Sequence, residues 1–283
     1  MLPNLLVIGA GKSGTTSLHY YLDQHPDIFM SFPKEPNFFQ RDTWQEKMDW
    51  YEGLFPKPAQ VRGEASTSYS AYPARKDVPR RVHETIPDVR MIYVVRDPID
   101  RIEAHYAQHL TNRKESRPID EAVRTILREG DDPVNPYVCM SRYATQVEQY
   151  LPFFPLDRIL VIDNAEMKSD RPAVLREAFG FLGVDETFDS PRFDEILNTK
   201  RDQVRFSAAG AKLRDSRVAR FVHNRVPRKV RGPITKPLTR MLSEPVQRPK
   251  LSPEVRAELE EELAPEVERL RELTGKRFAS WSV

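Results

Sequence analysis

Short apolar runs along the chain alternate with segments in which apolar residues recur every three or four positions. The sequence LLVI at residues 5–8 is apolar throughout and is followed by glycine, a pattern typical of a strand buried on both faces of a sheet. A stronger run, VRMIYVV, begins at residue 89, a third covers residues 157–167, and a shorter one surrounds residue 61. We expect these four runs to be strands.

Segments with helical spacing follow most of these runs. A helix over about residues 15–24 would turn Leu18, Tyr21 and Leu22 inward. The other predicted helices start at Pro98, cover residues 142–154 and 172–184, and run from the N-cap Ser252 through an acid-rich segment to residue 275. Strands that alternate with helices predict parallel βαβ units, and therefore an α/β fold with a central parallel β-sheet flanked by helices.

Composition narrows the class of protein. The chain has 283 residues, of which 39% are hydrophobic and 30% charged, so it can bury a core. A net charge of +2 gives no general attraction to nucleic acid. Cys139 is the single cysteine, which excludes an internal disulfide and a thiolate zinc cluster and fits a reducing compartment. The first residues lack a basic region and a long apolar run, so we expect a cytoplasmic protein with no stable membrane insertion.

The composition changes near residue 198. Between Lys200 and Lys250 there are 15 Lys or Arg residues and three acids. This segment is either a solvated irregular surface or a lid over an anionic ligand. We therefore expect a single domain over residues 1–283, with a core at 1–197, a basic cap at 198–250, and a C-terminal helix in 251–283 that packs on the core.

A glycine-rich turn, GAGKSGTTSL, joins the first predicted strand to the first predicted helix. It lacks the first glycine of a Walker A loop, because that position is Leu6. Backbone N–H groups from Lys12 to Thr16 can still surround an anion at the helix N-terminus. Lys12 adds a charge, and the hydroxyls of residues 15–17 add donors. The alternative is an ordinary glycine-rich turn.

Two further motifs point to a family. The sequences FPKEPNFF at 32–39 and YVVRDPIDRIEAHY at 93–106, together with GKSGTTSL at 11–18, resemble the sulfotransferases that use 3′-phosphoadenosine-5′-phosphosulfate (PAPS). The resemblance is to the carbohydrate branch, which includes heparan sulfate sulfotransferases and soluble bacterial relatives, and the motifs occur in the same order. It implies a P-loop NTPase-like three-layer fold.

The resemblance also implies a role for each motif. Glu35 would be the general base, with Lys12 next to the leaving phosphate and Lys34 near the phosphosulfate, and Arg96 would bind the 3′-phosphate. The residues implied to hold the phosphosulfate are Gly11, Lys12, Ser13, Gly14, Thr15, Thr16 and Ser17. Lys200 and Arg201 loosely match a late cofactor loop. PAPS would be the sulfate donor, and the reaction requires no metal.

The chain departs from the family pattern at two positions. Ala104 stands where the family has a serine for the 3′-phosphate, and Ala65 stands where the heparan enzymes have a lysine. Arg101, or basic residues in the segment NTKRDQVRFS at 198–207, could replace the lost hydroxyl. Lys12 and Lys34 would have to supply the lost charge.

Other candidate residues have ordinary explanations beside functional ones. His105 and His109 lie four apart on one helix, but no third ligand is apparent, so packing is favoured over a metal site. His105 is the reserve candidate for the base. Asp97 is expected to cap the helix that starts at Pro98. The aromatic residues that line either the acceptor cleft or the core are Phe38, Phe39, Tyr69 and Tyr72.

The sequence thus predicts a sulfotransferase that moves the sulfuryl group of PAPS to an acceptor hydroxyl and releases PAP. The acceptor would be a glycan or small molecule, such as a carbohydrate, lipid or secondary metabolite. One alternative is a P-loop kinase for a small molecule. Another is a non-catalytic anion-binding protein that uses the basic segment at 200–250. The identity of the acceptor and the oligomeric state are not specified by any pattern.

Overall fold

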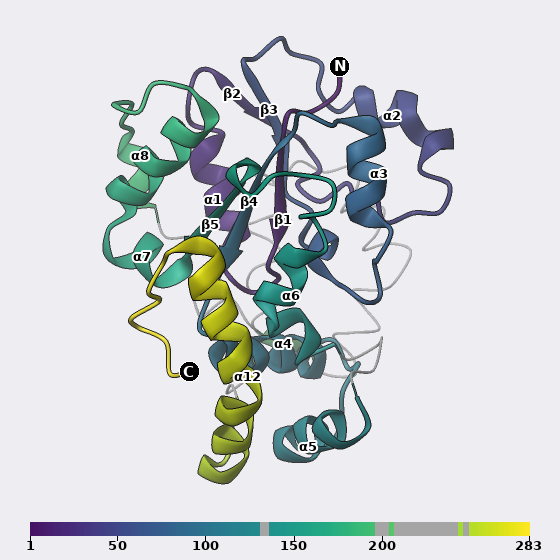
Figure 1. Ribbon diagram of the computed structural model, residues 1–283, viewed down its shortest axis with the longest axis vertical. Helices are drawn as coiled ribbons and strands as arrows, with labels where there is room; N and C mark the ends of the chain where they lie inside the picture. The colour runs from purple at the N-terminus through teal and green to yellow at the C-terminus, as the bar shows by residue number, and fades with distance from the viewer. Residues whose placement is uncertain (131–135, 196–203, 207–242, 246–248) are drawn as a thin grey trace.

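The computed structural model describes residues 1–130, 136–195, 204–206, 243–245 and 249–283 (Figure 1). Its centre is a sheet of five parallel strands in the order β2-β3-β1-β4-β5. The strands are β1 Leu5–Gly9, β2 Ile28–Met30, β3 Val61–Glu64, β4 Arg90–Val95 and β5 Ile159–Asp163. A separate antiparallel pair joins β6 Val204–Phe206 to β7 Ser243–Pro245.

Nine helices are described. They are α1 Thr15–Leu22, α2 Met48–Glu52, α3 Val78–Thr85, α4 Pro98–Thr111, α5 Ile119–Glu129, α6 Tyr143–Glu148, α7 Asn164–Ser169, α8 Arg171–Leu182 and α12 Pro253–Thr274. Short 3₁₀ turns occur between them, including η2 Thr67–Ser70. The caps of α12 are as expected, because the Ser252 side chain accepts a hydrogen bond from the Val255 N–H and Gly275 follows the last turn in a left-handed conformation.

Two predicted elements differ from the observed ones. The expected strand over 157–167 ends at Asp163, whose carboxylate accepts a hydrogen bond from the Ala165 N–H and starts α7. The expected helix over 142–154 ends at Glu148, a few residues before Pro152, which cannot continue a helix. Strand β2 and helices α2, α3 and α5 were not predicted.

The sheet separates two hydrophobic cores, and successive residues of β1 alternate between them. Leu6 and Ile8 pack with residues of α3, α6 and the C-terminal half of α12. Leu5 and Val7 pack on the other side with residues of α1, α7 and α8. This alternation follows from the two-residue period of a strand. The predicted three-layer α/β fold is confirmed.

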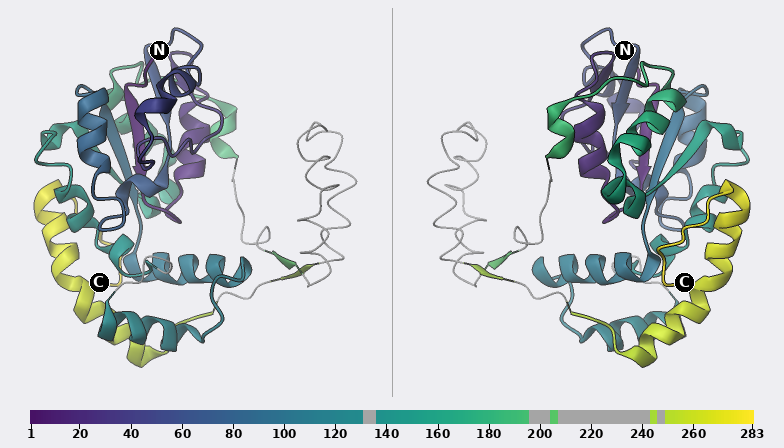
Figure 2. Two further views of the ribbon diagram at one scale, coloured as in Figure 1. Left: turned by 90° about the vertical axis from the view of Figure 1, so that its right-hand side faces the viewer. Right: turned by 90° about the vertical axis from the view of Figure 1, so that its left-hand side faces the viewer.

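A third, smaller core lies beyond the carboxyl edge of the sheet. It joins α4, α5 and the N-terminal half of α12, and Figure 2 shows α4 lying across the molecule below the sheet. The residues before α12 are tied to α4 at Glu103, which is buried. Its carboxylate accepts hydrogen bonds from Lys250 Nζ at 2.5 Å and from the Leu251 N–H at 3.3 Å.

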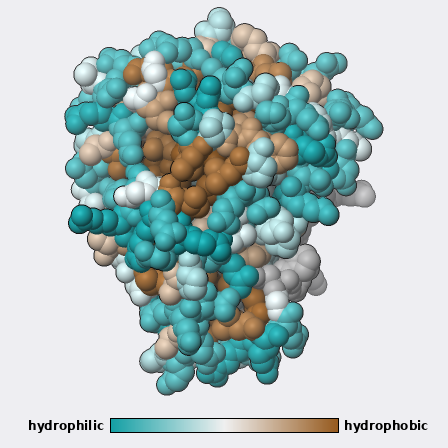
Figure 3. Space-filling view, in the orientation of Figure 1, coloured by the Kyte–Doolittle hydropathy of each residue, from teal (hydrophilic) through white to brown (hydrophobic). Residues whose placement is uncertain are grey.

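The surface in the orientation of Figure 1 is hydrophilic over most of its area, and its hydrophobic residues gather near the centre of this face (Figure 3). Within the ranges given above, no helix combines the length and the apolar composition needed to cross a membrane.

The third core provides a test of the packing. Leu263 of α12 is fully buried, so Leu263→Ala should lower the free energy of unfolding by about 2–5 kcal/mol through lost burial and the cavity left behind. Leu156 is 37% exposed, and Leu156→Ala should change this free energy by no more than about 0.5 kcal/mol. Urea denaturation of both variants would measure the difference. Equal losses would contradict the assignment of Leu263 to a packed core.

Candidate active site

The loop between β1 and α1 is shaped by glycines whose positions admit no side chain. Gly14 has a φ of 103°, and a Cβ atom there would lie 2.3 Å from Asn164 Nδ2. A Cβ atom on Gly9 would lie 2.0 Å from the Ser70 hydroxyl oxygen. The loop is therefore held between the start of α7 on one side and η2 on the other.

The loop presents the N-terminus of α1 without a capping side chain, because the N-cap residue is Gly14. The first-turn N–H groups of a helix have no partners within the helix and favour an anion. Lys12 has a φ of 73° and is half-buried. Ser13 differs from the expectation: it is fully buried beside the Tyr143 hydroxyl, and its N–H donates to the Ala10 carbonyl at 3.2 Å.

Lys34 connects the loop to the KEP motif, residues 34–36. Its Nζ atom donates to Thr15 Oγ1 at 3.2 Å, to Glu35 Oε1 at 2.7 Å and to the Ala65 carbonyl at 3.2 Å. The Lys34 side chain is 18% exposed, and that of Glu35 is 42% exposed. The structure thus brings together the predicted base, a predicted cation and the predicted phosphate loop.

Arg96 follows the last residue of β4 and lies beside the same edge of the sheet. Its Nη2 atom forms an ion pair with Asp100 Oδ2 at 2.5 Å. Partial burial opposes the charged form of Asp100, but the hydrogen bond and charge of Arg96 together hold its pKa below the ordinary value. Asp97 caps α4 as predicted, because its Oδ1 atom accepts from the Asp100 N–H at 2.9 Å.

Arg101 points into the interior and not toward an anion site. It is fully buried, and it donates to Ser141 Oγ at 2.6 Å and to the Tyr137 carbonyl. A third contact joins Arg101 Nη1 to His105 Nδ1 at 3.3 Å. Burial, followed by the charges of Arg101 and its neighbours, lowers the pKa of His105 well below its ordinary value, so the ring is neutral at pH 7.

The remaining expected site residues are placed as follows. Thr15 is buried, Thr16 is exposed, and Gly11 and Ser17 are half-buried in the loop and first turn. Lys200 and Arg201 lie outside the described residues, as does most of the basic segment. Of the four candidate aromatic residues, Phe38, Phe39 and Tyr69 belong to the core and Tyr72 is half-exposed. Within the described ranges, no group of three or more His, Cys, Asp or Glu side chains could hold a metal ion.

Comparison with known families agrees with these motifs. The family described as the sulfotransferase domain matches residues 2–212, which include the phosphate loop, Glu35 and Arg96. The chain belongs to this family.

Curated relatives of this sulfotransferase domain carry related names. It is 30% identical over 196 residues to the human bifunctional heparan sulfate N-deacetylase/N-sulfotransferase 3, a match that covers 65% of this chain and 22% of that protein. It is 31% identical over 196 residues to the mouse heparan sulfate glucosamine 3-O-sulfotransferase 6, covering 68% of this chain and 55% of that protein. The chain therefore spans less than two thirds of the length of either relative.

Solved structures share the fold of this chain. A sulfotransferase from Alicyclobacillus acidocaldarius superposes with a TM-score of 0.69 at 24% identity, and the match covers 100% of both chains. The sulfotransferase domain from the curacin biosynthetic pathway superposes with a TM-score of 0.50 at 14% identity, covering 93% of this chain and 98% of that one. At these identities the likeness is one of fold.

One buried acid next to the candidate site was not predicted. Glu64, the last residue of β3, is fully buried. Its Oε1 atom accepts from Tyr69 at 2.6 Å and from Tyr51 at 3.1 Å, and its Oε2 atom accepts from Ser66 at 2.6 Å. An acid at the end of the short strand VRGE, followed by several hydroxyl residues, was the available sequence pattern.

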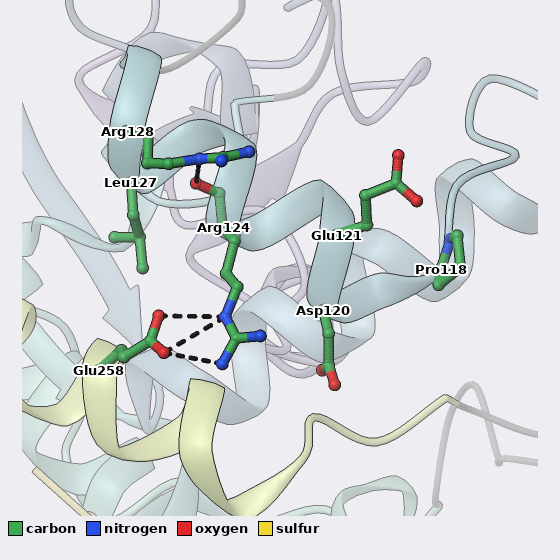
Figure 4. Close-up of a pocket in the computed structure, with 7 residues that line it drawn as sticks. All are labelled: Pro118, Asp120, Glu121, Arg124, Leu127, Arg128 and Glu258. Atoms are coloured by element: carbon green, nitrogen blue, oxygen red, sulfur yellow. Dashed lines mark hydrogen bonds and ion pairs between the residues drawn. The ribbon is translucent and has the colours of Figure 1, made fainter.

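The chain also has a surface groove of about 530 Å³ between α5 and α12. Figure 4 shows Arg124 and Glu258 facing each other across it, with Arg124 Nη2 at 2.9 Å from Glu258 Oε1. The groove is lined by Pro118, Asp120, Glu121, Arg124, Leu127, Arg128 and Glu258. None of these residues belongs to the phosphate loop, the KEP motif or the RDP motif, so the groove is separate from the candidate active site.

The burial of Glu64 predicts a pH-dependent stability. Burial is the main cause that raises its pKa to about 7, and the hydroxyl donors partly oppose it. The folded protein then binds more protons than the unfolded chain between about pH 4.5 and pH 7, so this residue's contribution to the free energy of unfolding decreases as the pH rises through that range.

Glu64→Gln removes the titrating carboxyl group, so the stability difference between wild type and this variant should depend on pH. The free energy of unfolding of the wild type, minus that of Glu64→Gln, should fall by roughly 2 kcal/mol between pH 5 and pH 8. Urea denaturation of both proteins at the two pH values would measure it. A difference that stays constant would show that Glu64 titrates near its ordinary pKa.

Proposed function

We propose that this sulfotransferase transfers the sulfuryl group of PAPS to a hydroxyl acceptor, with Glu35 as the general base. The observation that carries the proposal is the position of Lys34, whose ammonium contacts both Thr15 of the phosphate loop and the Glu35 carboxylate. A cation shared by an anion-binding loop and an acid is the arrangement that transfer between an anionic donor and a hydroxyl requires.

The residues at this edge of the sheet suit the donor. The uncapped N-terminus of α1 offers N–H groups to the 5′-phosphosulfate, and Lys12 and Lys34 add positive charge. Arg96 would bind the 3′-phosphate in place of its present partner Asp100. PAPS supplies an activated sulfuryl group whose phosphate is the leaving group.

The chain's own groups then divide the work. Glu35 accepts the proton of the acceptor hydroxyl as that oxygen forms its bond to sulfur. The bond between sulfur and the phosphate oxygen breaks, and its electron pair stays on the departing phosphate of PAP. Lys12 and Lys34 stabilise the charge that grows on the transferred and leaving oxygens.

Lys34 also offers a replacement for the lysine absent at position 65. The Ala65 side chain is fully buried in the core, while its carbonyl oxygen lies 3.2 Å from Lys34 Nζ. The ammonium of Lys34 thus lies beside the backbone of position 65, where the family has its lysine. The cation lost from the residue after β3 is replaced by one from the segment that contains Lys34.

The arrangement favours Glu35 over His105 as the base. The Arg101 guanidinium can only donate, so its contact with His105 Nδ1 requires a lone pair on that nitrogen. A neutral imidazole then carries its proton on Nε2, which leaves no ring nitrogen available to accept another proton. The Glu35 carboxylate keeps one oxygen outside its contact with Lys34.

Names of the relatives guide the choice of acceptors to test. Both heparan sulfate relatives are named for glycan sulfation, one at nitrogen and one at oxygen. A suitable panel contains N-acetylated desulfated heparin, N-deacetylated heparin, simple sugars and a phenol, each with PAPS. Sulfate transfer to any hydroxyl acceptor supports the proposal, whereas transfer only to the free amine would replace hydroxyl by amine as the acceptor class.

A P-loop kinase and a non-catalytic anion-binding protein are the competing functions. Thermal shift measurements separate them, because PAP should raise the melting temperature of a sulfotransferase. A rise with ATP and Mg²⁺ but none with PAP would favour the kinase. Binding to heparin that persists after Lys12 and Glu35 are both replaced would favour anion binding by the basic segment.

Glu35→Gln tests the base. The substitution keeps the size of the side chain and an oxygen for Lys34, but it removes the group that accepts the proton. Turnover should fall at least tenfold, roughly the lower range of a general base, while the thermal shift caused by PAP stays unchanged. Glu46→Gln, at an exposed acid, is the control and should retain full turnover. Normal turnover of Glu35→Gln would exclude this residue as the base.

Arg96→Ala tests the phosphate site. It should reduce the affinity for PAP by about tenfold or more, because a charged hydrogen bond to phosphate is typically worth about 1.5–3 kcal/mol. Titration calorimetry with PAP would measure the loss. Arg80→Ala, which removes an exposed arginine from α3, should leave the affinity unchanged. Equal affinities for the two variants would argue that Arg96 does not contact PAP.

A further inference from the structure

The backbone that follows Glu35 is held by two side-chain hydroxyls. The Asn37 N–H donates to Ser66 Oγ at 2.9 Å, and the Phe38 N–H donates to the Tyr69 hydroxyl at 3.0 Å. The KEP motif is therefore anchored to the segment after β3 immediately beyond its catalytic residue.

Each of these hydroxyls donates a hydrogen bond to Glu64. A hydroxyl has one proton, so an oxygen that accepts from a peptide N–H must donate elsewhere if it is to be satisfied in the interior. Ser66 donates to Glu64 Oε2 and Tyr69 donates to Glu64 Oε1, each at 2.6 Å. Both relays end at the same buried carboxylate, one on each oxygen.

We propose that Glu64 is a positioning residue for the active site, which acts through Ser66 and Tyr69 to fix the backbone that carries Lys34 and Glu35. This inference rests on the proposed role of Glu35. A carboxylate suits the task because both of its oxygens accept. A glutamine could accept on one side only, and its amide nitrogen would oppose the other hydroxyl.

The geometry of Asn37 extends the relay to the catalytic residue itself. Asn37 has a φ of 53°, a left-handed conformation that asparagine tolerates. Its Nδ2 atom donates to the Glu35 carbonyl at 3.0 Å, and its Oδ1 atom accepts from Ser68 at 2.6 Å. The Ala65 N–H donates to the Lys34 carbonyl at 2.9 Å. The turn after Glu35 is thus fixed on both sides by residues 65–69.

Tyr51 supplies a matched control. Its hydroxyl donates to the same Glu64 oxygen as that of Tyr69, at 3.1 Å, and its ring stacks on Phe38 with centroids 3.9 Å apart. Tyr51→Phe and Tyr69→Phe each remove one buried hydroxyl from Glu64 and keep the ring. Of these two tyrosines, Tyr69 has the hydroxyl that accepts an N–H from the segment after Glu35.

Amide hydrogen exchange of the full chain tests the inference without reference to activity. We expect exchange at Asn37 and Phe38 to be at least tenfold faster in Tyr69→Phe and Ser66→Ala than in wild type, and within twofold of wild type in Tyr51→Phe. Exchange rates in all three variants that agree within twofold would overturn the inference. Because these conservative changes remove no apolar packing from the Tyr69 and Tyr51 rings, they remain informative where Glu64→Gln fails to fold.

Kinetics distinguish positioning from a purely structural role. With PAPS and the acceptor that the wild type sulfates, Tyr69→Phe should lose at least tenfold in kcat with KM for PAPS within twofold, and Tyr51→Phe should keep its kcat. Equal kcat values for the two variants would contradict positioning. A wild type that sulfates no acceptor and binds no PAP would refute the proposed function, while the exchange rates would still decide whether the Ser66 and Tyr69 hydroxyls that bond to Glu64 fix this segment.

Discussion

Parallel pairing of four adjacent strands is the constraint on which the site depends. β1 lies between β3 and β4, and β2 pairs with the outer side of β3. Parallel strands end at the same edge of a sheet, so the residues that follow them meet there. The phosphate loop, the KEP segment, residues 65–70 and Arg96 each follow one of these four strands. The sheet alone therefore brings together four segments that lie far apart in the sequence.

The same edge of the sheet carries two cations, each of which is paired with an acid. Lys34 contacts Glu35, and Arg96 contacts Asp100, both within hydrogen-bond distance. These pairs lie on partly exposed side chains, where an ion pair contributes little to stability. Both cations are thus already paired with an acid in the structure.

The sequence was sufficient to predict the long or strongly patterned helices and strands. The strand at 5–9, the helix that starts at Pro98 and the capped helix α12 are set by local patterns, and three short motifs were enough to identify the family. β2 was missed because Ile28–Met30 has only three residues, too few to show a period. The prediction that β5 continues beyond Asp163 was wrong because that aspartate caps a helix directly after the apolar run. Glu64 was missed because its significance depends on the Ser66 and Tyr69 hydroxyls, which join it to the backbone of residues 37 and 38, far from it in the sequence.

Asp97 shows how the edge of the sheet is connected to the last residues described. One of its oxygens caps α4, and the other accepts hydrogen bonds from the N–H and the hydroxyl of Ser282, both at 2.7 Å. Trp281 packs against Tyr143, which lies beside Ser13 of the phosphate loop. Opening of the first turn of α4 and release of Ser282 therefore break bonds to a single carboxylate. We therefore expect local unfolding of the two segments to be coupled, although 185 positions separate Asp97 from Ser282.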